Sequence, residues 1–341
     1  MRIAIVNDMR MAVEILRRIV GSRSPKHEIA WVAYDGKEAV EKCIKDTPDI
    51  ILMDLIMPVM NGVESTRQIM DKAPCGILLV TVSVTTNSAK VFEAMSCGAL
   101  DAINTPVLGT DGSLKGADQL LQKIERLEVL CKNSGAKPLP MKKTNETVIA
   151  ISSGVPYMVA IGSSTGGPAA LAKLLAELPA NFGAAAVIIQ HIDQEFVPGL
   201  AEWLSTFTKV KVSLAVEGQT PLPNNVYLAA TNDHLIITRD LKFKYTEDLV
   251  EQPFRPSVDV FFESIYRHWP RIGTAVVLTG IGRDGAQGIL ALKNKGWQTM
   301  SQDKESCVVY GMPKAAAEIG AAEIILPPEK IGIELANNAI K

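Results

Sequence analysis

The run Ile50-Ile51-Leu52-Met53-Asp54 consists of four apolar residues followed directly by a carboxylate. A continuous apolar run of this kind is typical of a strand that is buried on both faces of a parallel sheet. Comparable runs recur through the first 130 residues, and amphipathic helical patterns lie between them. The sequence therefore predicts a (βα)5 doubly wound α/β domain. Its predicted strands are Ile3–Val6, Ile29–Ala33, Ile50–Met53, Ile77–Val82 and Ala99–Ile103.

A second α/β pattern begins near Pro156, after a stretch of different composition. Residues 132–147 read KNSGAKPLPMKKTNET, with two prolines, four lysines and two large apolar residues. Such a stretch buries too little apolar surface to fold alone, so we expect a linker there. The expected organisation is a first domain at 1–131, a linker at 132–155 and a doubly wound α/β domain at 156–341. The predicted strands of this second domain are Tyr157–Ile161, Ala185–Gln190, Val210–Val216, Val226–Ala230, Leu235–Thr238 and Ala275–Thr279.

The overall composition excludes several classes of function. Lys and Arg number 35 against 37 Asp and Glu, so the chain lacks the basic excess of a nucleic-acid binder. No apolar run approaches the 18 residues of a membrane span, and we expect neither membrane insertion nor a signal peptide. The five cysteines form no C-x-x-C pair, which favours reduced thiols over disulfides or a zinc site. We expect a soluble cytoplasmic protein.

Polar residues end three predicted strands of the first domain. Asp8 follows the first strand, Asp54 follows the third, and Thr81 lies near the end of the fourth. Ligands of open parallel sheets bind outside the carboxyl ends of the strands. Two carboxylates there repel each other unless a divalent cation lies between them, and Mg²⁺ prefers oxygen ligands. Asp54 can then attack a phosphoryl donor; the alternative is that both carboxylates merely cap the following helices.

The string MDLIMPVMNG at residues 53–62, after a first strand that ends Val6-Asn7-Asp8, resembles the receiver domain of two-component response regulators. The resemblance covers about residues 1–130 and implies a flavodoxin-like fold. It also implies that Asp54 is the phosphoacceptor, that Asp8, Asp54 and the backbone of Ile56 hold Mg²⁺, and that Thr81 is a switch residue. A partner histidine kinase would supply the phosphoryl group.

This chain departs from the receiver pattern at three positions. Asn7 stands where receivers have an acidic residue, Thr105 replaces the lysine before a proline, and Ala102 replaces an aromatic residue. The missing lysine removes the cation that pairs with the phosphoryl group. The missing aromatic removes the side chain that reports its arrival.

The second domain opens with a candidate nucleophile. Strand Tyr157–Ile161 runs into Gly162-Ser163-Ser164-Thr165-Gly166-Gly167-Pro168, which fits the G-x-S-x-G pattern of a sharp strand-to-helix turn that exposes Ser164. The free N–H groups at such a helix start stabilise a developing oxyanion. The same features suit a loop that binds phosphate, and the loop alone does not decide between the two.

A serine nucleophile needs a base, and His191 is the best placed of the four histidines because it directly ends strand Ala185–Gln190. A histidine at a strand end can equally be structural. His27 lies in the first domain, His268 looks like a helix end, and His234 follows Thr231-Asn232-Asp233 at a predicted turn.

The base needs an orienting carboxylate. Asp284 lies in the glycine-rich segment 280–285 after strand Ala275–Thr279, and Asp303 is its rival, alternatively a surface cap. Ser164, His191 and Asp284 can meet only if three strand ends are neighbours. The N–H groups near Thr165 and at Ile281 would then form an oxyanion hole.

The motifs IGSSTGGP (161–168), QH (190–191), LTGIGRDGA (278–286), RPSVD (255–259) and YGMPKA (310–315) together resemble the catalytic domain of the CheB family of response-regulator protein-glutamate methylesterases. The resemblance covers about residues 156–330. It implies hydrolysis of glutamate γ-methyl esters on the cytoplasmic helices of methyl-accepting chemoreceptors, deamidation of receptor glutamines and no cofactor for hydrolysis. Ser164 would be the nucleophile, His191 the base and Asp284 its orienting acid, under control of Asp54 phosphorylation.

The resemblance has one departure at the site: Ile192-Asp193 follows His191 where Met-Pro is expected, placing an acidic residue close to the base. The N-terminal details, Asn7-Asp8 and Thr105-Pro106, are most similar to members that serve Wsp-type surface-sensing pathways. The alternative from another class is a non-catalytic regulator, in which a receiver controls an α/β domain that binds receptors without hydrolysis.

Overall fold

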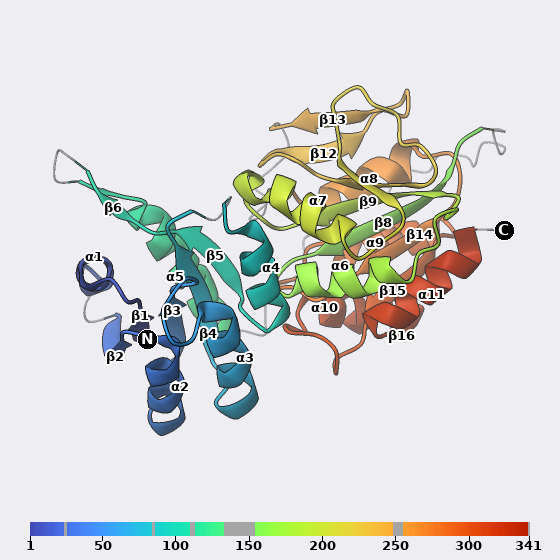
Figure 1. Cartoon of the computed structure of the whole chain (residues 1–341). Helices are drawn as coiled ribbons and strands as arrows, with labels where there is room; N and C mark the ends of the chain where they lie inside the picture. Colours follow the sequence, from blue (N-terminus) through green and yellow to red (C-terminus); the bar gives the residue numbers. More distant parts are fainter. Residues whose placement is uncertain (24–25, 84–85, 110–112, 133–153, 248–254, 340–341) are drawn as a thin grey trace. The chain divides into compact units, whose positions relative to one another are not determined.

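The computed structural model describes residues 1–23, 26–83, 86–109, 113–132, 154–247 and 255–339. The chain divides into two compact units, Met1–Ser134 and Gly135–Lys341, drawn in Figure 1 from blue to teal and from green to red. Apart from its end residues, the predicted linker 132–155 lies outside the described residues.

The first unit is built on a five-stranded parallel sheet in the order β2-β1-β3-β4-β5. This order confirms the predicted doubly wound fold. The fifth strand begins at Asp101 and not at Ala99, because the N–H of Ala99 bonds back to the carbonyl of Ala94 at the end of the preceding helix. The elements are β1 (Arg2–Val6), α1 (Arg10–Gly21), β2 (Glu28–Ala33), α2 (Gly36–Lys45), β3 (Ile50–Met53), α3 (Gly62–Lys72), β4 (Gly76–Thr81), α4 (Ser88–Ser96), β5 (Asp101–Asn104), a small antiparallel pair of β6 (Val107–Leu108) with β7 (Leu114–Lys115), and α5 (Ala117–Lys132).

The second unit is built on a seven-stranded parallel sheet in the order β10-β11-β9-β8-β14-β15-β16. From β8 the chain adds strands first on one side of the sheet and then, from β14 onward, on the other. The strand order therefore reverses between β8 and β14, the place where open α/β sheets bind their ligands. The elements are β8 (Tyr157–Ser163), α6 (Gly167–Ala176), β9 (Ala184–Gln190), the 3-10 helix η1 (Gln194–Phe196), α7 (Val197–Ser205), β10 (Lys211–Leu214), β11 (Asn225–Leu228), β12 (His234–Ile237), β13 (Phe243–Thr246), α8 (Val258–His268), β14 (Thr274–Val277), α9 (Ala286–Asn294), β15 (Gln298–Gln302), α10 (Met312–Glu318), β16 (Ile324–Leu326) and α11 (Pro328–Ala339).

Helices cover both faces of this sheet. Helix α6 packs against α7 and α11, whereas α8 packs against α9 and α9 against α10. Met158 and Ala160 of β8 belong to the same core cluster as Phe261 of α8 and Ile289 of α9. The intervening Val159 is equally inaccessible to water, as expected of a strand buried on both faces.

The structure corrects two parts of the sequence-based topology. The predicted strand Leu235–Thr238 does not join the main sheet: β12 pairs antiparallel with β13 and packs on α8, where Figure 1 shows the hairpin beside that helix. Strands β15 and β16 of the main sheet were not predicted. In β15 four of the five residues are polar, and the buried ones include Thr299 and Ser301, so this strand lacks a continuous apolar run. None of the helices in the described part of the chain combines the length and apolar character needed to cross a bilayer.

Candidate active site

The carboxyl ends of β9, β8 and β14 are neighbours, as the predicted site required. Ser163, the last residue of β8, is in register with Gln190, the last residue of β9. Ser164 and His191 therefore leave adjacent strands side by side. The N–H of His191 bonds to the carbonyl of Ser163 at 3.0 Å, and the N–H of Ser164 bonds to the carbonyl of Thr279, just beyond β14, at 3.0 Å.

Glycines bring the loops after β8 and β14 into contact at Ser164. The turn after Ser164 passes through Gly166, whose φ of 77° lies in the left-handed region that favours glycine. At Gly280 the approach is closer still: a Cβ atom there would lie 2.7 Å from the Cβ of Ser164. Thr165 directly follows Ser164, and Ile281 directly follows Gly280. The two predicted backbone donors of the oxyanion hole are therefore adjacent in sequence to this contact.

His191 and Asp284 form a hydrogen bond of 2.8 Å between Nε2 and Oδ2. Their side chains are 7% and 5% exposed, so water does not compete for this bond. The rival carboxylate, Asp303, instead accepts hydrogen bonds from the backbone and hydroxyl of Ser306 within its own loop. Because Nε2 of His191 faces Asp284, Nδ1 is the nitrogen that can take a proton from a serine hydroxyl.

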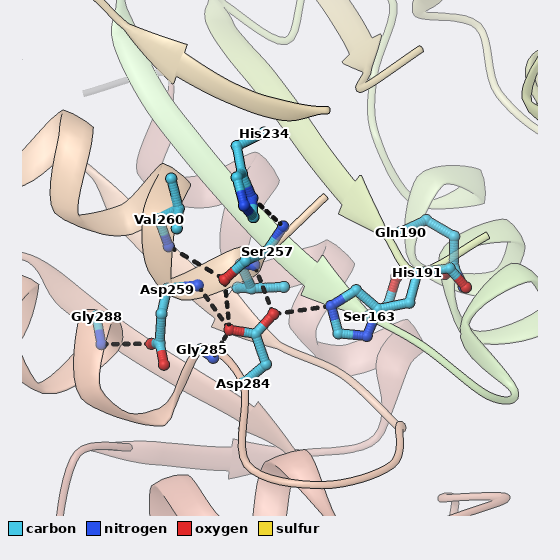
Figure 2. A network of polar contacts seen from close by, with 11 residues as sticks. Ser163, Gln190, His191, His234, Ser257, Asp259, Val260, Asp284, Gly285 and Gly288 are labelled. Atoms are coloured by element: carbon cyan, nitrogen blue, oxygen red, sulfur yellow. Dashed lines mark hydrogen bonds and ion pairs between the residues drawn. The ribbon is translucent and has the colours of Figure 1, made fainter. Parts of the chain in front are cut away.

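The carboxylate of Asp284 lies at the N-terminus of α8, as Figure 2 shows. It accepts hydrogen bonds from the hydroxyl of Ser257 at 2.9 Å and from the N–H groups of Val258 at 2.7 Å and Asp259 at 2.9 Å. Burial alone would raise its pKa, but the hydrogen bond and charge of His191 and these helix-end donors outweigh burial, so the pKa of Asp284 is lowered. Asp284 is therefore held as an oriented anion.

Gln190 ties the nucleophile loop to the histidine strand, a role that sequence reasoning missed. It accepts from the Ser163 hydroxyl at 2.6 Å and donates to the Ser164 carbonyl at 2.9 Å. A Cβ atom at Gly167 would lie 2.1 Å from Oε1 of Gln190, so the start of α6 packs closely on this amide.

Sequence reasoning also missed the supports behind Asp284. Ser257 is the N-cap of α8, which a serine before an apolar helical pattern indicates in retrospect. His234 follows residues 231–233, where a turn was predicted, and is the first residue of β12. It has no exposed surface, and its Nδ1 accepts the Ser257 N–H at 3.1 Å. Asp193, two residues after the base in sequence, is exposed, and its carboxylate accepts the N–H of Glu195 at the start of η1.

In the first unit, Asp54 follows β3 and is 6% exposed. Its Oδ1 accepts the N–H of Leu55 at 2.6 Å and that of Ile56 at 3.3 Å. Asn7 is uncharged, but its side-chain amide donates a hydrogen bond to Oδ2 of Asp54 at 3.0 Å. Burial raises the pKa of Asp54 to about 6, with a further contribution from the charge of Asp8.

Neither carboxylate of this pair caps a helix. The N-cap of α1 is Met9, without a side-chain cap, and that of α3 is Asn61. Thr81 ends β4 with 1% exposure, and its hydroxyl accepts from the amide of Asn87 at 3.3 Å. The mutual repulsion of Asp8 and Asp54 is the feature that a divalent cation relieves. Two carboxylates leave coordination positions for water, which suits Mg²⁺.

Comparisons with known proteins agree with both units. The family model "CheB methylesterase" matches residues 159–335, and the model "Response regulator receiver domain" matches residues 3–111. A Pseudomonas aeruginosa protein named protein-glutamate methylesterase/protein-glutamine glutaminase 3 is 49% identical over 98% of this chain and 99% of its own. A Pseudomonas syringae pv. syringae relative named protein-glutamate methylesterase/protein-glutamine glutaminase 2 is 50% identical over 96% of both chains.

A solved structure, the CheB methylesterase catalytic domain of Thermotoga maritima, aligns with 53% of this chain and 98% of its own at a TM-score of 0.52 and 35% identity. The fold and these matches define a response regulator whose receiver domain is joined to a methylesterase domain. The chain belongs to the CheB methylesterase family.

Proposed function

We propose that this protein hydrolyses glutamate γ-methyl esters on the cytoplasmic helices of methyl-accepting chemoreceptors and deamidates receptor glutamines. The names of its relatives support the reaction class. The single observation that carries the proposal is the hydrogen bond between His191 and Asp284, next to the strand end that presents Ser164. Methanol release from membranes that contain methylated chemoreceptors tests it.

In the proposed reaction, Oγ of Ser164 attacks the ester carbonyl while Nδ1 of His191 takes its proton. The N–H groups of Thr165 and Ile281 receive the oxyanion, and one good donor of this kind contributes ~3 kcal/mol. Collapse of the tetrahedral intermediate expels methoxide, which takes the proton from His191 and leaves as methanol. Asp284 holds the imidazole in one tautomer and stabilises the imidazolium.

The acyl-enzyme is then hydrolysed by water, which His191 deprotonates, and the glutamate side chain is released as a free acid. A glutamine side chain forms the same acyl-enzyme with ammonia as leaving group, so one site serves both reactions. Every step uses side chains and backbone of this unit, and the hydrolysis requires no cofactor.

We propose that a partner histidine kinase phosphorylates Asp54 and thereby activates the esterase. Asp54, Asp8 and the backbone carbonyl of Ile56 would hold Mg²⁺, and the cation would neutralise charge on the phosphoryl group. Because the pKa of Asp54 is about 6, this carboxylate is ionised at neutral pH and can act as the nucleophile. Asn7 positions it, and the hydroxyl of Thr81 can bond to a phosphoryl oxygen.

Incubation with Mg²⁺ and acetyl phosphate is expected to label Asp54 and to raise methanol release. Asp54→Asn should remove both effects, since an amide forms no acyl phosphate. Asp71→Asn on the exposed surface of α3 is the matched control and should behave as wild type. Intact-protein mass and initial rate are measured together. Labelling of Asp54 without any change in rate would contradict control by phosphorylation.

We further propose that the protein acts in the cytoplasm, in a Wsp-type surface-sensing pathway. The support is in the receiver: Asn7-Asp8 and Thr105-Pro106 are the features in which the chain is most similar to that branch of the family. Binding of the receiver to the kinase and receptor of such a pathway, compared with those of a chemotaxis pathway, tests the assignment.

A further inference from the structure

Two carboxylates meet where α8 and α9 begin, and the proposed mechanism uses just one of them. Asp259, in the first turn of α8, donates its N–H to Oδ1 of Asp284 at 2.9 Å. In return, Oδ1 of Asp259 accepts the N–H of Gly288, in the first turn of α9, at 2.7 Å. Figure 2 shows both bonds. Asp284 precedes α9 and binds the start of α8, and Asp259 belongs to α8 and binds the start of α9.

The starts of α8 and α9 pack closely at this junction. A Cβ atom at Gly288 would lie 2.5 Å from the Cβ of Phe262, and one at Gly285 would lie 2.8 Å from Cγ1 of Val258. The φ of Gly285 is 87°, in the left-handed region that favours glycine, and its N–H bonds to Oδ1 of Asp284 at 3.0 Å. Close packing and reciprocal hydrogen bonds thus tie the position of Asp284 to that of Asp259.

We infer that Asp259 is a positioning residue of the active site. It holds the turn that presents Asp284 to His191, and its negative charge adds to that of Asp284 in stabilising the imidazolium. The inference rests on the proposed esterase function. Asp259 acts through Asp284 and touches neither substrate nor nucleophile in this role.

The charge of Asp259 changes across neutral pH. Burial first, and then the adjacent charge of Asp284, raise the pKa of Asp259 to about 7, although backbone N–H donors at the start of α9 favour the anion. The other titratable groups at the junction are His191, bonded to Asp284, and His234, bonded to the Ser257 N–H with Arg255 and Asp233 as charged neighbours.

The sign of the effect follows from these charges. Below neutral pH Asp259 is protonated, and Asp284 alone faces the imidazole. Above neutral pH a second negative charge is added, which stabilises the imidazolium and makes His191 a stronger base. The charge of Asp259 is therefore expected to raise kcat on the alkaline side.

The test compares kcat and KM for methanol release between pH 5.5 and 9 in the full chain, wild type against Asp259→Asn. The asparagine keeps an acceptor oxygen for Gly288 but no charge. We expect an unchanged KM and a wild-type to variant ratio of kcat that grows to about tenfold above pH 8. Glu263→Gln, on the same helix and paired with Arg267, is the matched control and should follow wild type at every pH.

A ratio that stays constant across pH, or equals one throughout, would overturn the inference. Carboxyl ¹³C resonances of the folded wild type provide a readout that does not depend on the variant folding: Asp259 should titrate near neutrality, and a midpoint near 4 would overturn the inference. The Ser164→Ala variant distinguishes failure of the proposed function from failure of the positioning role alone. If wild type and that variant release methanol equally slowly, the proposed function fails; if the variant is inactive while Asp259→Asn parallels an active wild type, the positioning role alone fails.

Discussion

Replacement of Ser164 by alanine is expected to lower methanol release from methylated chemoreceptor membranes by about 10⁴-fold or more. The variant loses the oxygen that forms the acyl-enzyme, while the hydrogen bond between His191 and Asp284 is left in place. Ser164 is 5% exposed and its backbone is bonded to Thr279, so removal of one hydroxyl should leave the loop intact. Initial rates and far-ultraviolet circular dichroism are measured on the same samples.

The neighbouring serine is the natural control. The hydroxyl of Ser163 donates to Gln190 and is buried. Ser163→Ala removes this neutral hydrogen bond and leaves the buried Gln190 oxygen without that donor, at a cost of about 1–3 kcal/mol of stability, and its activity should stay within about tenfold of wild type. If wild type and Ser164→Ala release methanol equally slowly, the proposed enzymatic function is lost and a non-catalytic, receptor-binding regulator takes its place.

Asp284→Asn should lower kcat by about 10⁴-fold. Asp284 accepts from His191, from Ser257 and from backbone N–H groups at the start of α8. An asparagine must direct its NH₂ group toward one of these partners. If it faces His191, Nε2 must become the acceptor, and the proton then resides on Nδ1, where it prevents proton transfer from Ser164.

The rival carboxylate is the control for this second experiment. Asp303 bonds to Ser306 within its own loop, so Asp303→Asn should keep nearly full activity. Thermal unfolding of both variants separates lost catalysis from the weakened N-terminus of α8. An Asp284→Asn enzyme that is folded and retains more than about a tenth of wild-type activity would rule out its role as the orienting acid.

Much of the fold and part of the site follow from local sequence. Apolar runs such as Ile50–Met53 predict the strands, because a strand buried on both faces has no polar side to display. The glycines around Ser164 likewise predict a sharp strand-to-helix turn, because such a turn needs them. The ends of the predicted strands then identify Asp54, Ser164 and His191 as candidate site residues. Where a strand carries buried polar residues, as β15 does, the pattern disappears and the strand is missed.

The contacts between distant segments were decided by tertiary structure alone. Sequence nominated both Asp284 and Asp303, and the packing of α8 against α9 placed Asp284 against His191. In the first unit, the pairing of β1 with β3 set the Asn7 amide against Asp54. Each of these bonds joins residues at least 47 positions apart. Local periodicity reports which face of an element is buried, but the partner of a buried polar group depends on strand order and helix packing, which arise when the whole domain closes.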